Sequence, residues 1–550
     1  MRVLLVYPEF PTTYWGFQFS LPLIFSGATL PPLGLISVAA MLPDSWDLRL
    51  VDLNIESLDD EALSWAEVVL VSGMLVQEAS MHDILRRARS LGRRTVVGGP
   101  ACTSSPELFP EADHLFLGEV EGRAGELWAA MKGQAGAPRV LPEPLERPAL
   151  TMVPVPRFDL LQLRRYRSLS LQTSRGCPYQ CEFCDIVVRF GRVPRVKTPP
   201  QVLAELDALY GLGYRGDIFV VDDNFIGNKA RVRPILTAMA AWQDQQRRPF
   251  SFYTEASLNL AADDELIALM LEASFYSVFI GIETPDAATL KHAGKLQNVR
   301  VDVRAAVDKL TRAGFEVMGG FIVGFDGDGP ESFEAQLELL RDLPVPLAMV
   351  GLLTAFPGTP LYQRLEAAGR LRAPTGGDAF GRMNFEPTMP EAALVSHYGR
   401  LLTELYSPDT YFRRSAALVE RVGKPRRSAQ LRGIDVRIAL NAVVRLGLFG
   451  RRRARFWGLL WRGLRRSVSA TRSAISCAVM GEHLQRYTEE IMIPRLTQAL
   501  HEIAGTTKPA ASRSRQWSRA PDSALSTSRP GPTAAPSSER GLAEPERRAR

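Results

Sequence analysis

The sequence has few cysteines and no long apolar run, which excludes disulfide-rich proteins and membrane-spanning helices. It contains five cysteines in 550 residues with no regular pairing pattern, which excludes a disulfide-rich scaffold. It also lacks a run of about 18 to 20 apolar residues, the length that a membrane-spanning helix needs. The N-terminus reaches Pro8 and Glu9 after a short apolar stretch, unlike a signal peptide. We therefore expect a cytoplasmic protein, long enough for about three domains.

Charge is unevenly distributed along the chain. Residues 1–410 carry 38 basic and 50 acidic side chains, a net charge of −12, which argues against a nucleic-acid-binding surface there. Residues 411–475 carry 17 basic and 2 acidic side chains, a net charge of +15. Within this region, the basic segment 424–467 also contains several Phe, Trp and Leu residues, and two interpretations remain open. It lies on the inner face of an anionic membrane as a peripheral contact, or it packs against the acidic part of the protein.

Short apolar runs alternate with helical patterns in residues 1–135, which predicts a doubly wound parallel sheet. Ligands of such sheets bind at the carboxyl ends of the strands. Residues 136–167 are predicted as a linker. The expected strand ends are Pro8-Glu9, Asp52-Leu-Asn54, Ser72-Gly-Met74, Gly98-Gly-Pro100 and Gly118-Glu119.

The alternation resumes with a longer period in residues 168–374. Six strand–helix units predict a partial (β/α)6 barrel, whose chemistry belongs at the carboxyl ends of its strands. Residues 375–505 are predicted to form a mainly helical C-terminal domain. Residues 506–550 are rich in Pro, Ser, Ala and Arg, and we expect them to be a disordered tail.

Three of the cysteines form a compact C-x3-C-x2-C run, Cys177, Cys181 and Cys184, whereas Cys102 and Cys477 are distant in sequence. Three thiolates on one loop can hold three irons of a cubane iron–sulfur cluster and leave the fourth iron open. A structural zinc site needs four ligands, and no fourth Cys or His is nearby. The alternative is that these are three unrelated small apolar residues in a loop.

The cysteine run, with Phe183 before its last member, resembles the cluster loop of the radical S-adenosylmethionine (SAM) enzymes. The resemblance covers roughly residues 1–410. It is strongest to the cobalamin-binding group with an additional C-terminal domain, which includes hopanoid and bacteriochlorophyll methylases. It implies a [4Fe-4S] cluster, SAM and cobalamin as cofactors, and an electron donor such as flavodoxin or ferredoxin.

The resemblance also implies an activity. The cluster of such an enzyme cleaves SAM to a 5′-deoxyadenosyl radical, and cobalamin-dependent C-methylation of an unactivated carbon follows, on a small-molecule or lipid-like substrate. Two alternatives remain open. The same cofactors can serve a radical cyclisation or rearrangement, and the chain can be a non-catalytic, cluster-bearing binding or sensor protein.

Several strand-end residues match the positions at which this family binds SAM. Asp222-Asp223-Asn224 stands where the family usually has Gly-Gly-Glu, so which aspartate receives the SAM ammonium is open. Further cofactor contacts are implied near the ends of two later strands. The alternative is that strand-end carboxylates are solvated or cap the next helix. The further residues are Glu255, Ser257, Gly281 and Glu283.

The N-terminal sheet resembles the cobalamin-binding fold, which often carries the cobalt-ligating His of an Asp-x-His-x-x-Gly motif. Here the run is Asp52-Leu-Asn54, with Asn in place of the His, so we expect cobalamin without a histidine ligand from this motif. Paired glycines allow close approach of the backbone to a ligand. The alternative is a sheet that kept its shape and lost its cofactor. The later matching positions are Ser72, Met74, Gly98, Gly99 and Pro100.

Overall fold

The N-terminal part of the chain is a six-stranded, all-parallel sheet in the order β2-β1-β3-β4-β5-β6, as the sequence predicts. The computed structural model describes residues 1–373, 375–423 and 432–506. The segment predicted as a linker, 136–167, contains β6, so part of it belongs to the sheet. The strands are β1 (Arg2–Tyr7), β2 (Asp47–Asp52), β3 (Val68–Ser72), β4 (Arg94–Gly98), β5 (His114–Phe116) and β6 (Val140–Leu141).

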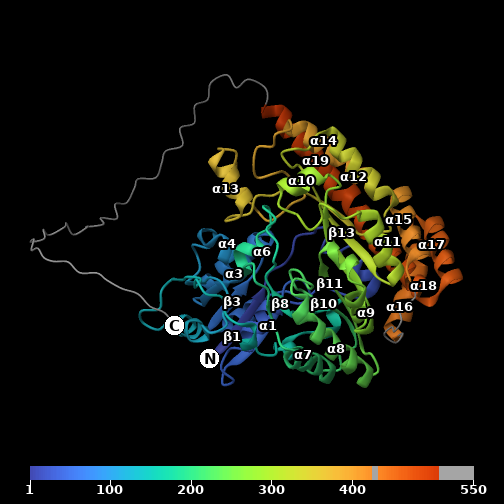
Figure 1. Cartoon of the computed structure of the whole chain (residues 1–550). Helices are drawn as coiled ribbons and strands as arrows, with labels where there is room; N and C mark the ends of the chain where they lie inside the picture. Colours follow the sequence, from blue (N-terminus) through green and yellow to red (C-terminus); the bar gives the residue numbers. More distant parts are fainter. Residues whose placement is uncertain (374, 424–431, 507–550) are drawn as a thin grey trace, which may run out of the picture. The chain divides into compact units, whose positions relative to one another are not determined.

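Helices cover both faces of this sheet because its strands are apolar on both sides. One face packs against α2 (Asp60–Trp65), α3 (Glu78–Ser90) and α4 (Gly99–Ser104). The other packs against α1 (Leu33–Ala39) and α5 (Ala124–Lys132). Figure 1 shows this sheet in blue beside the green barrel.

A second six-stranded parallel sheet follows, in the order β7-β10-β11-β12-β13-β14. Because β7 and β14 are edge strands in the described chain, the barrel is partial, as predicted. Residues 174–196 add a short antiparallel pair and the helix α6 (Ile186–Phe190). The barrel strands are β7 (Leu169–Leu171), β10 (Gly216–Val220), β11 (Phe250–Ala256), β12 (Phe275–Glu283), β13 (Glu316–Val323) and β14 (Ala348–Leu352), and the pair is β8 (Ser174–Arg175) with β9 (Arg195–Val196).

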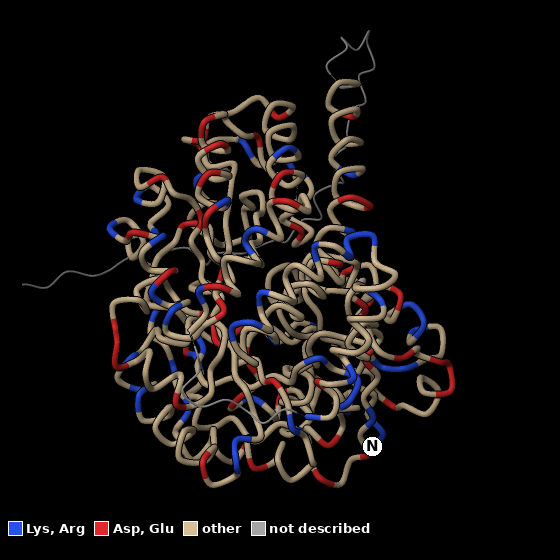
Figure 2. The backbone as a smooth tube through the Cα atoms, turned by 90° about the vertical axis from the view of Figure 1, so that its right-hand side faces the viewer, with Lys and Arg blue, Asp and Glu red and all other residues tan. Residues whose placement is uncertain are grey.

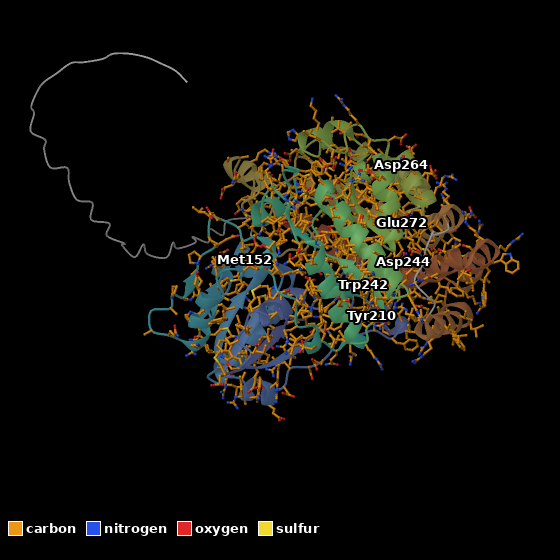
Figure 3. The ribbon with its side chains drawn as sticks, turned by 60° about the horizontal axis from the view of Figure 1, so that its bottom comes forward. Met152, Tyr210, Trp242, Asp244, Asp264 and Glu272 are labelled. Carbon is orange, nitrogen blue, oxygen red and sulfur yellow. The ribbon has the colours of Figure 1, made fainter. Side chains whose placement is uncertain are left out.

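Helices cover the outer face of the barrel. Tyr210 of α7 and Trp242 of α8 (Figure 3) meet edge to face with ring centroids 5.9 Å apart. Trp242 also stacks on Phe250 of β11. The opposite face of the strands is therefore the barrel interior. The helices are α7 (Pro199–Gly211), α8 (Lys229–Gln245), α9 (Asp264–Glu272), α10 (Ala287–His292), α11 (Val303–Ala313), α12 (Pro330–Asp342) and α13 (Pro360–Ala367).

The described residues after 375 are mainly helical and lie beside α11 and α12 (Figure 1). π-helical stretches extend two of the helices. None of the described helices is long and apolar enough to cross a bilayer. The predicted disordered tail, from 507 on, and residues 424–431 of the basic segment lie outside the described residues. The elements are α14 (Glu391–Leu405), α15 (Pro408–Arg421), α16 (Gly433–Ala442) with η8 (Val443–Leu448), α17 (Arg453–Arg466), α18 (Val468–Tyr487) with η9 (Thr488–Met492), and α19 (Ile493–Thr506).

Candidate active site

The three cysteines lie in the loop between β8 and α6. The backbone N–H of Cys177 donates to the carbonyl of Gly191 at 3.2 Å, and that of Cys184 donates to the carbonyl of Cys181 at 3.1 Å. Gly176 has φ +101°, and a Cβ there would lie 2.9 Å from the Gly191 carbonyl, so the tight turn requires glycine. The positive φ of Gly176 and these two backbone hydrogen bonds thus fix the shape of the loop before any cofactor binds.

The thiols fit an iron–sulfur cluster better than a single ion. In the described parts of the chain, no three His, Cys, Asp or Glu side chains converge as the ligands of one ion must. The thiols of a cubane bind different irons and need not converge. Two amides point at the sulfurs: Asn224 Nδ2 lies 3.8 Å from Cys177 Sγ, and Gln297 Nε2 lies 3.9 Å from Cys181 Sγ. Amide donors of this kind stabilise the charge of cluster thiolates.

The polar triplet after β10 anchors the cluster loop. Asp222 is buried and accepts hydrogen bonds from the backbone and hydroxyl of Thr173 and from the hydroxyl of Ser174. Asp223 accepts from the backbone N–H of Gly176 at 2.8 Å, and burial raises its pKa to about 6. Both oxygens of Asp222 already accept hydrogen bonds from Thr173 or Ser174. Asp223 is therefore the better candidate for binding the ammonium group of SAM.

Glu255 and Ser257, at the end of β11, lie beside the polar triplet that follows β10: Asn224 Nδ2 donates to the Ser257 hydroxyl at 3.3 Å. Burial, followed by the charges of Asp223 and Asp222, raises the pKa of Glu255 to about 7. The hydroxyl of Ser257 donates to Asn259 at 2.7 Å. The amide of Asn259 donates to the Tyr179 hydroxyl at 2.8 Å, which connects β11 to the cysteine loop.

Glu283, at the end of β12, pairs with a lysine that the sequence analysis missed. Lys295 Nζ donates to Glu283 Oε1 at 2.5 Å, and both side chains are nearly buried. Burial lowers the pKa of Lys295, but Glu283 and the Cys181 thiol outweigh it, so the pKa is raised. Asn298 donates to the carbonyl of Gly281 at 2.9 Å. The ammonium therefore lies between the SAM-site candidate Glu283 and the cysteine loop.

No spacing rule could have identified Lys295 or its neighbour Gln297. Both lie in the irregular segment after α10, and the cysteine that Gln297 contacts is 116 residues earlier in the chain. The segment reaches the cysteine loop because the backbone N–H of Glu182 donates to the Ala293 carbonyl at 2.9 Å. Phe183, in the same loop, meets Phe325 edge to face at 6.1 Å.

The second group of predicted residues lies at the carboxyl edge of the N-terminal sheet. Ser72 and Gly98 are partners in neighbouring strands, and Gly99 opens α4 with φ +83°. A Cβ on Gly99 would lie 2.2 Å from Ser72 Oγ, so only glycine fits. Met74 is 51% exposed and Pro100 is also exposed. This edge offers small residues and open surface to a large planar ligand such as cobalamin.

Asn54 is used within its own loop. Its side-chain oxygen accepts from the backbone of Phe10 at 2.9 Å, and its nitrogen donates to the Pro8 carbonyl and to Asp52. Asp52 is buried and also accepts from the Tyr166 hydroxyl at 2.9 Å. Both residues fix the ends of β1 and β2. Their contact with a cofactor stays a prediction, and no cobalt ligand comes from the Asn54 side chain in this arrangement.

Salt bridges join this edge to the cysteine loop. Glu119, just after β5, is nearly buried between Arg175 of β8 and Arg195 of β9, at 2.5 and 2.8 Å. Arg189 of α6 donates to the carbonyl of Pro100 and to the hydroxyl of Ser104 in α4. The carboxyl edge of the sheet and the cluster loop therefore face each other.

A cleft of about 220 Å³ lies where these two parts meet, and residues from both line it. The N-terminal sheet contributes residues of α4 and the loop after β6, and the barrel contributes α6 and the turn after β14. The lining residues are Thr103, Ser104, Glu143, Asp185, Val188, Arg189, Phe356, Pro357 and Gly358.

Comparison with family models divides the chain in the same way. Residues 23–127 match the B12 binding domain, and residues 171–340 match the radical SAM superfamily. Residues 359–494 match a domain described only as being of unknown function.

Two similar curated proteins span nearly the whole chain. One is the hopanoid C-2 methylase of Rhodopseudomonas palustris, 34% identical over 89% of this chain and 94% of that protein. The other is an uncharacterized methyltransferase of Synechocystis sp., 39% identical over 89% of this chain and 92% of that protein. Among solved structures, the radical SAM methyltransferase TsrM from Kitasatospora setae, with cobalamin and a [4Fe-4S] cluster bound, has the same fold. Its TM-score is 0.59 and its identity 18%, and the match covers 85% of this chain and 99% of that one.

Proposed function

The chain belongs to the cobalamin-dependent radical SAM methylases, which methylate carbon, and we propose that its substrate is an apolar, polycyclic molecule of lipid character. When bound, the cluster and SAM supply a 5′-deoxyadenosyl radical, and cobalamin supplies the methyl group. We assign Cys177, Cys181 and Cys184 to three irons of the cluster. The fourth iron is then left for SAM.

The remaining site residues hold and orient these groups. We assign Asp223, Glu255 and Glu283 to the polar groups of SAM, with Lys295 neutralising Glu283 beside the cysteine loop. Ser72 and Gly99 form the edge that would hold cobalamin. The Glu119 salt bridges keep this edge facing the cysteine loop.

The observation that carries the substrate class is an aromatic pair at the barrel interior. Phe279 of β12 is in register with Glu255 of β11, so both side chains point to the same face of the sheet. The alternate residues, Val278 and Ile280, are fully buried under the outer helices. Phe279 therefore faces the interior, one strand away from a proposed SAM contact.

Trp15, in the loop after β1, meets Phe279 edge to face with centroids 5.3 Å apart and is 46% exposed. Two contacts with α18 and η9 hold this loop just before Trp15: the Tyr14 hydroxyl lies 2.8 Å from Thr488 Oγ1, and His483 Nε2 lies 2.9 Å from the Thr13 carbonyl. A fixed, half-exposed indole beside a second ring is an apolar wall. Such walls favour apolar ring systems over charged substrates.

The interior positions of the neighbouring strand, β13, also favour an apolar substrate. Met318 and Gly320 are in register with Phe279 and Gly281, and a Cβ on Gly320 would lie 2.9 Å from the Phe279 ring. The interior face of β13 at these positions thus carries apolar or small residues and no cation for the carboxylates of a tetrapyrrole. Supported by this lining, we favour a polycyclic lipid over a tetrapyrrole.

A lipid-like substrate makes the inner face of the cytoplasmic membrane the site of action. The cluster also requires an external one-electron donor, which we propose to be a reduced flavodoxin or ferredoxin.

The test is anaerobic reconstitution with iron, sulfide, cobalamin, reduced flavodoxin and methyl-deuterated SAM, followed by mass analysis of polycyclic triterpenoids and tetrapyrroles as candidate substrates. We expect the deuterated methyl group in a triterpenoid. The Trp15→Ala variant should raise KM for that substrate several-fold while cobalamin and iron contents stay unchanged. Trp65→Ala, on α2 of the N-terminal sheet, is the control. Methylation of a tetrapyrrole alone would overturn the substrate proposal.

A further inference from the structure

Two consecutive helices in the C-terminal part expose an apolar stripe to solvent. In the continuous helix formed by α16 and η8, every fourth residue from 436 to 448 is apolar, and each is between 42% and 62% exposed. A four-residue spacing places them on one side of a helix. They are Val436, Leu440, Val444 and Leu448.

The next helix, α17, is apolar on two sides. Phe456, Leu459 and Leu460 are buried and pack among α15, α18 and η8. The other apolar side is exposed, together with Phe449 in the connecting turn, which is 80% exposed. The exposed residues are Trp457, Trp461, Leu464 and Val468, between 43% and 67% exposed.

The two stripes form one surface. Trp457 Nε1 donates to the carbonyl of Gly447 at 2.9 Å, which holds the indole against η8. A Cβ on Gly447 would lie 2.9 Å from Phe456 and 3.2 Å from Trp457, so the helices approach closely because this residue is glycine. We call this surface, residues 436–468 of α16, η8 and α17, the α16–α17 face.

The charge of the α16–α17 face has one sign. Residues 436–468 contain nine arginines and no Asp, Glu or Lys. Three of these arginines pair with acidic residues of neighbouring helices, for example Arg455 with Asp409. In Figure 2 the side that carries α17 and α18 in Figure 1 faces the viewer, with Lys and Arg in blue. The exposed arginines that form no ion pair with any described residue are Arg437, Arg445, Arg451, Arg453, Arg465 and Arg466.

We propose that the α16–α17 face docks on an anionic lipid bilayer. A contiguous apolar surface of this kind is unusual on a soluble monomer, and it marks a binding surface. Tryptophan and leucine beside unpaired arginines are the composition of helices that lie in the membrane interface. The alternative from the sequence, a helix packed on the protein with a solvated basic face, describes the buried side of α17 but not this face, because the exposed apolar stripe points away from α15 and α18.

The position of the face suits delivery of a lipid to the barrel. Asn441 of α16 donates to the carbonyl of Leu23, and Arg437 lies over the ring of Phe25, which is 45% exposed. Leu23 and Phe25 belong to the same loop that carries Trp15 to the barrel interior. One loop thus connects the proposed membrane surface with the proposed substrate wall.

The docking proposal does not depend on the substrate, and its test uses the full chain without SAM or substrate. The protein is floated with vesicles of phosphatidylcholine alone or with 30% phosphatidylglycerol, at low salt and at 1 M salt. We expect the protein to float with the anionic vesicles. At high salt the bound fraction should fall several-fold, because salt screens the attraction between the arginines and the anionic lipid.

Two sets of variants separate the contributions of the apolar and basic residues. Phe449→Ser, Trp461→Ser and Leu464→Ser together should reduce vesicle binding at least tenfold without changing the melting temperature, because all three side chains are exposed. The control combines Leu145→Ser, Val155→Ser and Leu212→Ser, exposed apolar residues elsewhere. Replacing Arg451, Arg453 and Arg465 by Glu should abolish the preference for anionic vesicles, whereas the same change at Arg86, Arg89 and Arg231 should not.

Three outcomes would overturn the proposal: no flotation of the native chain, equal binding of the apolar variant, or a concentration-dependent dimer that the apolar variant abolishes in the absence of vesicle binding. The last outcome would assign the face to a second copy of the chain. A chain that docks but does not methylate a lipid would overturn only the proposed substrate.

Discussion

Lys295 and Glu283 form a buried ion pair whose removal has a predictable sign and size. Their side chains are 12% and 8% exposed, and the N–O distance is 2.5 Å. Removing one partner leaves an uncompensated buried charge and lowers the free energy of unfolding by about 3–5 kcal/mol, whereas removing both partners leaves no buried charge. We expect Lys295→Met and Glu283→Gln each to destabilise the apoprotein locally by about 3 kcal/mol, and the double variant to cost about 2 kcal/mol less than the sum.

The assay is hydrogen exchange of peptides that cover β12 and residues 284–298, because local opening reports this region separately from global unfolding. Arg312→Met is the control: Arg312 pairs with Asp308 on the surface of the same barrel and is 66% exposed, so its loss should cost less than about 1 kcal/mol. Additive effects of the two single changes would refute the reasoning, since they would show that the charges do not compensate each other. With the cofactors restored, Glu283→Gln should also weaken SAM binding about tenfold, the loss of one charged hydrogen bond.

Three further predictions concern the cofactor sites. Replacing the three cluster cysteines by alanine should remove iron, sulfide and visible absorbance but leave cobalamin binding intact, as elemental analysis and spectra will show. Gly99→Ala should reduce cobalamin retention after desalting at least several-fold, because the new Cβ would collide with Ser72. Gly92→Ala, also at positive φ but in open space, should leave retention unchanged. The cobalamin retained by the native protein should show the spectrum of a form without a histidine ligand. Because burial raises the pKa of Glu255 from 4.5 to about 7, the native fold favours its protonated form, and stability is lost as pH rises from 4.5 through 7. Glu255→Gln should therefore melt above the native apoprotein at pH 8 and equal it at pH 4.5, and equal melting at both pH values would contradict this.

The sequence predicted both sheets because fully buried parallel strands appear as short apolar runs. It predicted that the three cysteines share one loop because they lie within eight residues of each other; their role as cluster ligands stays a prediction. It missed β6, Val140–Leu141, because a two-residue edge strand in a Pro-rich segment has no periodicity. It could not divide the roles of Asp222 and Asp223, since only the fold shows that Thr173 and Ser174 occupy the first.

Long-range partners were also beyond the sequence. Lys295 forms an ion pair with Glu283, and Trp15 contacts the ring of Phe279, 264 residues later in the chain. The sequence could not predict the exposure of Trp461 either. A helix with apolar residues on two sides buries one of them, and only its neighbours decide which one.

The central claim is methylation by a SAM-derived radical with cobalamin as the methyl carrier. Its most direct test is anaerobic turnover of methyl-deuterated SAM with reduced flavodoxin as the electron donor, in which the amounts of both SAM-derived products are measured. The account predicts equal amounts of 5′-deoxyadenosine and S-adenosylhomocysteine, with the deuterated methyl group on a carbon of the substrate. Formation of 5′-deoxyadenosine and an altered substrate without methyl transfer would contradict it in favour of a cyclisation or rearrangement. Neither product from fully loaded protein, with every candidate substrate present, would contradict it in favour of a binding or sensor protein.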